Sequence, residues 1–210
     1  MKLLLNVVKK LPLLLILLVL VSCGGKEERK AKYLEKGKVY LEDKNYDKAR
    51  IEFRNVVQID PKYPEVYFFM GRLEEEKKEL GSAVGNYKKA IELDDKYAEP
   101  KVRLARLYSI IGTEQYLSEA RELIDQVLAA DKENNEAKLV LSIINYRGGD
   151  KEKALKDIES LVADSPLLVE GVSLLAANYD TNDQYAKAIG IIEKTTAMVD
   201  DISLEITVAK

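Results

Sequence analysis

Histidine and tryptophan are absent from this 210-residue chain, and cysteine occurs once, at Cys23. Without an imidazole there is no Ser-His-Asp or Cys-His catalysis and no histidine metal site. A single thiol excludes an intramolecular disulfide and a cysteine-rich zinc site. We therefore expect no metal ion and no dissociable cofactor.

Carboxylates are the main groups left that could carry catalysis, and they occur as consecutive residues. Three glutamates begin at Glu74 and two aspartates at Asp94. Consecutive residues of a helix point about 100° apart, so their carboxyl groups do not converge on a substrate. A glycine-rich phosphate loop is also missing from the sequence. The chain is predicted not to be an enzyme.

The charge balance excludes two further classes of protein. The chain has 33 basic and 36 acidic residues, a net charge of −3, and a hydrophobic fraction of 47%. This much apolar material argues against a disordered chain. The near-neutral charge, without a basic block, argues against nucleic acid as a partner.

The first 22 residues have the pattern of a secretory signal peptide. Their charged residues are Lys2, Lys9 and Lys10, and an unbroken apolar run follows over residues 13–21. A transmembrane helix needs about 20 apolar residues, and this run is about half as long. A basic start followed by a short apolar run is typical of a signal peptide.

The end of this segment resembles the lipobox of bacterial lipoproteins, in the sequence Leu20-Val21-Ser22-Cys23. The resemblance implies cleavage before Cys23 and a covalent lipid on its thiol; the alternative is an unmodified Cys after an ordinary signal peptide. By the same resemblance, Gly24, which is not Asp, implies the periplasmic face of the outer membrane in preference to the inner membrane or the cell surface. Residues 23–30 are expected to be the lipidated Cys and a short unfolded tether.

The rest of the chain is an internal repeat. Small residues recur at spacings of 34, 34, 37 and 34, at Gly37, Gly71, Ala105, Ser142 and Ala176. A second series has the same spacings, at Ala49, Ala83, Ala120, Ala154 and Ala188. Bulky residues follow the second series by four, at Phe53, Tyr87, Ile124, Ile158 and Ile192. The shared irregularity predicts one insertion, in the turn near residues 112–115.

Apolar positions three and four apart predict two helices per repeat and no sheet. We expect helices over residues 31–43, 46–59, 64–77, 80–93, 98–111, 117–130, 135–147, 151–163, 168–180 and 184–198. Residues 203–210 are expected to begin a sixth first helix and then stop, which would indicate a shortened chain, an incomplete gene or a native stub. The fifth repeat would then expose an apolar edge.

This pattern resembles the tetratricopeptide repeat (TPR) family, whose period is 34 and whose unit is two antiparallel helices. The resemblance implies an all-α fold, an α-solenoid of about five TPR hairpins in a right-handed superhelix. The repeats are predicted at residues 31–63, 64–97, 98–134, 135–168 and 169–202. Glu74 and Asn145 depart from the family, which usually has Tyr at their position.

The same resemblance places partner-binding positions on the first helix of each repeat. The position after the small residue carries Lys38, Arg72 and Arg106, which are expected to form a basic ladder along a groove, with Arg103 on a neighbouring line. Phe68 belongs to an apolar series one turn earlier, with Leu34, Val102 and Leu139. Glutamates that could neutralise the ladder recur at Glu65, Glu99, Glu136 and Glu170.

Such a groove suits an extended protein or peptide partner with acidic groups. The sequence from Tyr40 to Arg54 resembles the N-terminal repeats of TPR lipoproteins of exopolysaccharide and PEP-CTERM systems. We therefore expect a membrane-anchored scaffold for protein partners in the periplasm, in an envelope assembly, secretion or exopolysaccharide system. Direct binding of an anionic polysaccharide is one alternative. A lipoprotein of type IV pilus or outer-membrane protein assembly is another.

Overall fold

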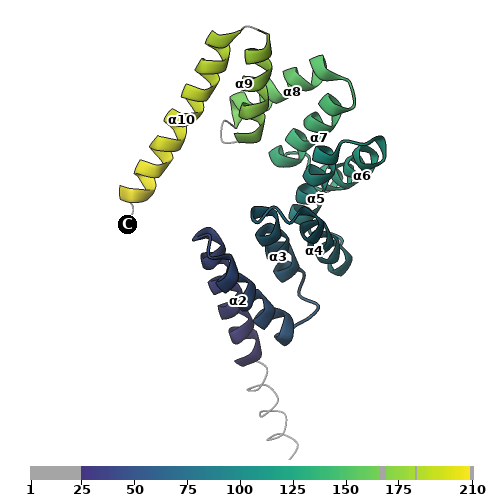
Figure 1. Ribbon diagram of the computed structural model, residues 1–210, viewed down its shortest axis with the longest axis vertical. Coiled ribbons are helices and arrows are strands. Elements are labelled where there is room, and N and C mark those ends of the chain that lie inside the picture. The colour runs from purple at the N-terminus through teal and green to yellow at the C-terminus, as the bar shows by residue number, and fades with distance from the viewer. Residues whose placement is uncertain (1–24, 166–168, 183, 209–210) are drawn as a thin grey trace, which may run out of the picture. The chain divides into compact units, whose positions relative to one another are not determined.

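The computed structural model of the chain describes residues 25–165, 169–182 and 184–208 (Figure 1). Every regular element in these ranges is an α-helix, so the predicted all-α class is confirmed. The predicted signal peptide and Cys23 lie outside the described residues. The handedness of the superhelix stays a prediction.

The chain divides into two compact units, Met1–Tyr97 and Ala98–Lys210. The first contains a helix over residues 25–42 followed by α2 (Tyr46–Ile59), α3 (Pro64–Glu76) and α4 (Leu80–Leu93). The second contains α5 (Ala98–Ile111), α6 (Glu114–Ala130), α7 (Asn135–Arg147), α8 (Lys151–Asp164), α9 (Val169–Thr181) and α10 (Tyr185–Val208). The two helices of a predicted repeat pack together in α3 and α4, α5 and α6, α7 and α8, and α9 and α10.

Left-handed residues end the first helix in each of the first four repeats. They are Lys44, Lys78, Gly112 and Gly149, with φ angles of 57°, 64°, 72° and 108°. All four lie seven positions after the small residue of their repeat, so the reversal has one register. The turn is closed by backbone hydrogen bonds such as the one that Asn45 N donates to Tyr40 O, 2.8 Å away.

Three predicted segments differ from the structure. Residues 25–30 are helical, not an unfolded tether, because the Lys30 ammonium binds Glu27 at 2.7 Å and Asp60 at 3.0 Å and so fixes this turn to the following repeat. The three-residue insertion lengthens α6 to 17 residues, and the turn before it is only Gly112 and Thr113. The Thr113 side chain caps that helix by accepting a hydrogen bond from Tyr116 N at 3.4 Å.

The third difference is at the C-terminal end. Helix α10 runs without a break from Tyr185 to Val208, so a separate sixth helix does not begin at residue 203. Neither Gly nor Pro occurs after Gly190 to interrupt it. On this helix Ile189 is 54% exposed and Ile192 is 49% exposed, whereas the residues equivalent to Ile192 in the four earlier repeats are fully buried. The expected apolar edge is therefore present on the fifth repeat.

The small residue of each repeat marks the closest approach of its two helices. A Cβ atom built on Gly37 would lie 2.3 Å from the Phe53 ring, and one on Gly71 would lie 2.4 Å from the Tyr87 ring. Both rings are fully buried. Glycine is thus required where the opposite residue is aromatic. The later repeats instead place Ala105 and Ser142 at this position, and the residues in the ring register are Ile124 and Ile158.

Glu74 occupies the position where the family usually has Tyr, and the structure gives a physical reason. Arg50 of α2 reaches across to α3 and donates from Nη2 to both carboxylate oxygens of Glu74, at 3.1 Å each. Burial, and then the hydrogen bond with Glu79, raise the pKa of Glu74, while Arg50 opposes this shift. Asn145, the other departure, likewise accepts a hydrogen bond from Arg121 at 2.5 Å.

In the second unit, the positions equivalent to Arg50 and Glu74 in repeats four and five follow the family pattern. Leu155 and Tyr179 hold the two positions in repeats four and five, and both pack against the same core cluster. The chain therefore has two kinds of residue pair at equivalent contacts between repeats. One kind is an arginine with a polar acceptor, and the other is an aliphatic residue with a tyrosine.

Replacing Gly37 by Ala is expected to lower the free energy of unfolding by about 1–3 kcal/mol, because the new methyl group overlaps the Phe53 ring. Adding Phe53→Ile reproduces the Ala105 and Ile124 combination, so the double variant should be less destabilised than the sum of the single variants. Chemical denaturation followed by circular dichroism measures both. Gly85→Ala is the control: no atom lies within 4 Å of that Cβ, and stability should rise by about 0.5–1 kcal/mol. If Gly37→Ala changes the free energy of unfolding in the same way as Gly85→Ala, the close approach of Gly37 to the Phe53 ring is contradicted.

Arg50→Leu is expected to cost about 2–4 kcal/mol, because it leaves the buried Glu74 carboxylate without its cation. Combining it with Glu74→Tyr installs the Leu155 and Tyr179 type of pair and should restore most of that stability. A double-mutant cycle by urea denaturation at pH 7 measures the coupling, which we expect to exceed about 1 kcal/mol. Additive single effects would show that the two positions do not act as a pair.

Candidate partner-binding site

The first two basic residues of the predicted ladder meet at one aromatic ring. The Lys38 ammonium lies 4.7 Å from the centroid of Phe69, and the Arg72 guanidinium carbon lies 5.6 Å from it. Phe69 and both cationic side chains are half-buried. Cations held over a ring face are stabilised by its quadrupole, so Phe69 positions both groups. The structure thus brings Lys38 and Arg72 together, on the helix over residues 25–42 and on α3.

Glu65 neutralises the first of these cations, as its place in the repeat suggested. Lys38 Nζ donates to Glu65 Oε1 at 2.7 Å, and the Tyr63 hydroxyl donates to Glu65 Oε2 at 2.5 Å. Burial by itself would raise the pKa of Glu65, but these two hydrogen bonds outweigh it and the pKa falls below its usual value. Burial and the adjacent carboxylate raise the pKa of Tyr63 to about 12. Tyr63 therefore remains a hydrogen-bond donor at neutral pH.

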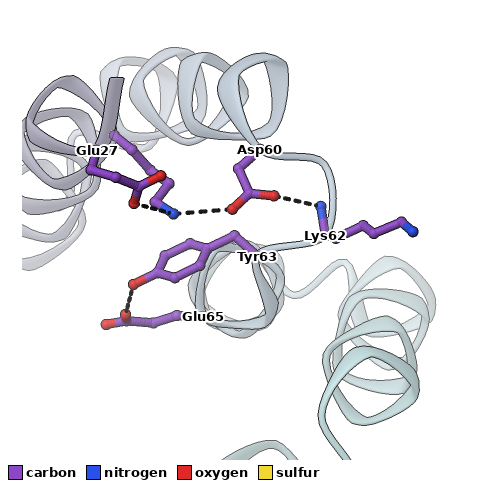
Figure 2. A network of polar contacts seen from close by, with 6 residues as sticks. Glu27, Asp60, Lys62, Tyr63 and Glu65 are labelled. Carbon is purple, nitrogen blue, oxygen red and sulfur yellow. Dashed lines mark hydrogen bonds and ion pairs between the residues drawn. The ribbon is translucent and has the colours of Figure 1, made fainter. Parts of the chain in front are cut away.

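A second lysine extends the network toward the N-terminus (Figure 2). Lys30 Nζ lies 4.4 Å from the centroid of the Tyr63 ring and binds both Glu27 and Asp60. The hydrogen bond to Glu27 is the largest cause that raises the pKa of Lys30, and the bond from Lys30 lowers the pKa of Asp60. Figure 2 shows Tyr63 between the Asp60 carboxylate and the Glu65 carboxylate. This lysine is therefore fully engaged within the protein.

Arg72 differs from both lysines. Among the described residues of the first unit, no carboxylate forms an ion pair with it, and its contact is the Phe69 ring. A half-exposed guanidinium on an aromatic ring can still offer its N–H groups to a partner's carboxylate. The first-unit face, defined here as Lys38, Phe69 and Arg72 with Tyr63 and Glu65, therefore has one available cation beside an apolar ring.

The second unit uses its ladder residue differently. Arg106 of α5 forms an ion pair with Glu170 of α9, with Nε and Oε2 2.8 Å apart. Arg103 lies one turn earlier on α5 and is half-buried. The equivalent positions in repeats four and five are Ile143, which belongs to the core, and Ala177.

Phe68 does not line a binding surface, and this corrects the expectation. It is only 8% exposed, and its ring centroid lies 6.1 Å from that of Tyr87 and 5.4 Å from that of Tyr97. The rest of its series is buried too, at Leu34, Val102 and Leu139. These positions face the packed interior, whereas the neighbouring Phe69 is half-buried.

Sequence reasoning missed the roles of Phe69 and Tyr63. Phe69 is two residues before Gly71, where repeat one has the exposed Glu35, so no recurrence marks the position. Tyr63 precedes α3 and lies outside both repeat series. The sequence signal for Tyr63 was its recurrence one period later as Tyr97, and the signal for Phe69 was only the local abundance of aromatic residues between Tyr63 and Phe69.

Two negative findings apply to the described ranges alone. Within them, no three His, Cys, Asp or Glu side chains gather in a way that could hold a metal ion. None of their helices has the length and apolar character needed to cross a bilayer.

Comparison with known proteins identifies the repeat. Family models described as "Tetratricopeptide repeat" match residues 33–63, 64–97 and 117–167, together more than half of the chain. No curated protein matches the chain at a significant level.

Solved structures share the fold at low sequence identity. A thermophilic TPR protein from Thermus thermophilus has a TM-score of 0.69 and 19% identity over 86% of this chain and 97% of that one. A TPR protein from Parabacteroides merdae has a TM-score of 0.65 and 18% identity. The match covers 80% of this chain and 64% of the Parabacteroides protein. PilW, a type IV pilus biogenesis factor, has a TM-score of 0.65 and 17% identity over 81% of this chain and 78% of that one.

These structures support the same architecture as the family models, which match the predicted repeat period. The chain therefore belongs to the tetratricopeptide repeat family, whose members are protein-interaction scaffolds.

Proposed function

We propose that this protein is a lipid-anchored scaffold that recruits protein partners in the bacterial periplasm through its first-unit face. The observation that carries the binding part is the Lys38, Phe69 and Arg72 arrangement, with one cation available beside a half-exposed ring. The lipobox at Cys23 supports the anchor, and several acyl chains would hold the protein stably at a membrane.

The chemistry of this face favours a peptide over a polyanion. Lys38 is neutralised by Glu65, and in the second unit Arg106 is neutralised by Glu170. A polysaccharide with many negative charges would meet these carboxylates as well as the cations. A peptide that places one acidic group at Arg72 and an apolar side chain at Phe69 would meet no such repulsion.

The similarity to PilW supports an envelope assembly role as the setting. PilW is a type IV pilus biogenesis factor, and the same fold with a lipobox would suit a scaffold in assembly, secretion or exopolysaccharide export. The fold alone does not select among these systems.

A photocrosslinking amino acid at Phe69 is expected to capture a protein partner in cells of the native bacterium, whereas the same group at the exposed Ile51 of α2 is not. Arg72→Ala should abolish the adduct, because the available cation is lost. Arg54→Ala is the matched control, since Arg54 is an exposed arginine of the same unit, and it should leave the adduct intact. Adducts are identified by mass spectrometry. If both arginine variants reduce capture equally, general charge explains it and the face is not the site.

The anchor makes a separate prediction. Cells fed labelled palmitate should incorporate the label into the wild-type protein, and the protein should sediment with membranes. Cys23→Ser should lose both properties, because the thiol that receives the lipid is gone. Equal labelling of the variant would refute the anchor without affecting the scaffold proposal.

A further inference from the structure

The ion pair between Arg106 and Glu170 links the first helices of repeats three and five. In the first unit, Lys38 instead pairs with Glu65, the recurrent glutamate of the very next repeat. The corresponding neighbour of Arg106 is Glu136, which is exposed. Arg106 thus forms its ion pair with the glutamate of repeat five and not with Glu136 of repeat four.

The residues of repeats four and five make this long-range pairing possible. At the register position of Arg106 they carry Ile143 and Ala177, neither of which offers a competing charge. Ile143 is only 4% exposed and packs in the core cluster. Glu170 is consequently the carboxylate that meets Arg106 on this side of the second unit.

The pair is close but incompletely formed. Arg106 Nε and Glu170 Oε2 are 2.8 Å apart and shielded from solvent, yet neither atom has a partner in hydrogen-bond geometry. The N–H is therefore not aimed at the oxygen. A guanidinium binds a carboxylate best through two parallel N–H bonds, and a free carboxylate is able to adopt that arrangement.

We propose that Arg106 is a carboxylate-binding site of the second unit, and that Glu170 occupies it as an internal competitor. Its ligand is an acidic side chain or C-terminal carboxylate of a peptide partner, which displaces Glu170 when it binds. This site rests on the scaffold function proposed above, but it requires neither the first-unit face nor the lipid anchor.

The test measures binding of a fluorescein-labelled hexaglutamate peptide to the full chain in detergent, by fluorescence anisotropy. Every protein carries Arg72→Ala, which removes the available cation of the first-unit face. Glu170→Gln is expected to tighten binding at least about tenfold, because the site is no longer occupied. Glu136→Gln makes the same change in net charge at the exposed equivalent position, and it should have little effect. Arg106→Gln combined with Glu170→Gln should show no gain.

Three outcomes would overturn the proposal. They are an equal gain in Glu136→Gln, a gain that persists without Arg106, and a gain for a hexauronate oligosaccharide but not for the peptide. Helicity and the thermal midpoint are measured alongside. If Glu170→Gln is poorly folded, Glu170→Asp decides the matter: it keeps the charge but withdraws the carboxylate by one methylene. A gain in peptide affinity in that variant supports the competitor role, and no gain refutes it.

Discussion

The close approach of two helices at one small residue per repeat is the constraint on which the rest of this protein depends. Gly37 and Gly71 have aromatic rings pressed against the space where a Cβ would lie. Where the opposite position is isoleucine, the small residue is Ala or Ser. A larger residue on one helix is therefore matched by a smaller one on the other, as expected for a close-packed interior. This contact fixes the rotation of each first helix, and so it fixes the direction of the residue that follows, which is the ladder position.

A second pair of matched positions lies between neighbouring repeats, and there a polar pair can replace an apolar one. Arg50 with Glu74, and Arg121 with Asn145, stand where Leu155 and Tyr179 stand later in the chain. A buried ion pair of this kind is not inherently more stable than an apolar pair. Losing Arg50 alone would leave the buried carboxylate of Glu74 without its cation, so these two positions are expected to change together. The departures from the family pattern at Glu74 and Asn145 are thus halves of local pairs.

The helices could be predicted from the sequence because repeated periodicity gives several independent indications of each one. The missed features depend on contacts that no local pattern encodes. The helical turn at residues 25–30 is tied down by Asp60, about thirty residues away in the sequence. Phe68 and Phe69 are adjacent and chemically identical, and the rings of Tyr87 and Tyr97 decide which of them is buried. The ladder was identifiable by register, but its neutralisation depends on which glutamate comes within reach.

Under the proposed scaffold function, that neutralisation would bear on which partners the chain selects. Lys38 and Arg106 occupy equivalent positions, yet one pairs with the next repeat and the other with the repeat after it. Repeats four and five carry Ile143 and Ala177 at the ladder position, so no further basic residue stands there to compete for Glu170. A groove whose cations are already paired gains little from a nonspecific polyanion, because each new contact must replace an existing one. Under the proposal, it would respond to a ligand that places a carboxylate in better geometry than the internal one, so selectivity would depend on arrangement more than on total charge.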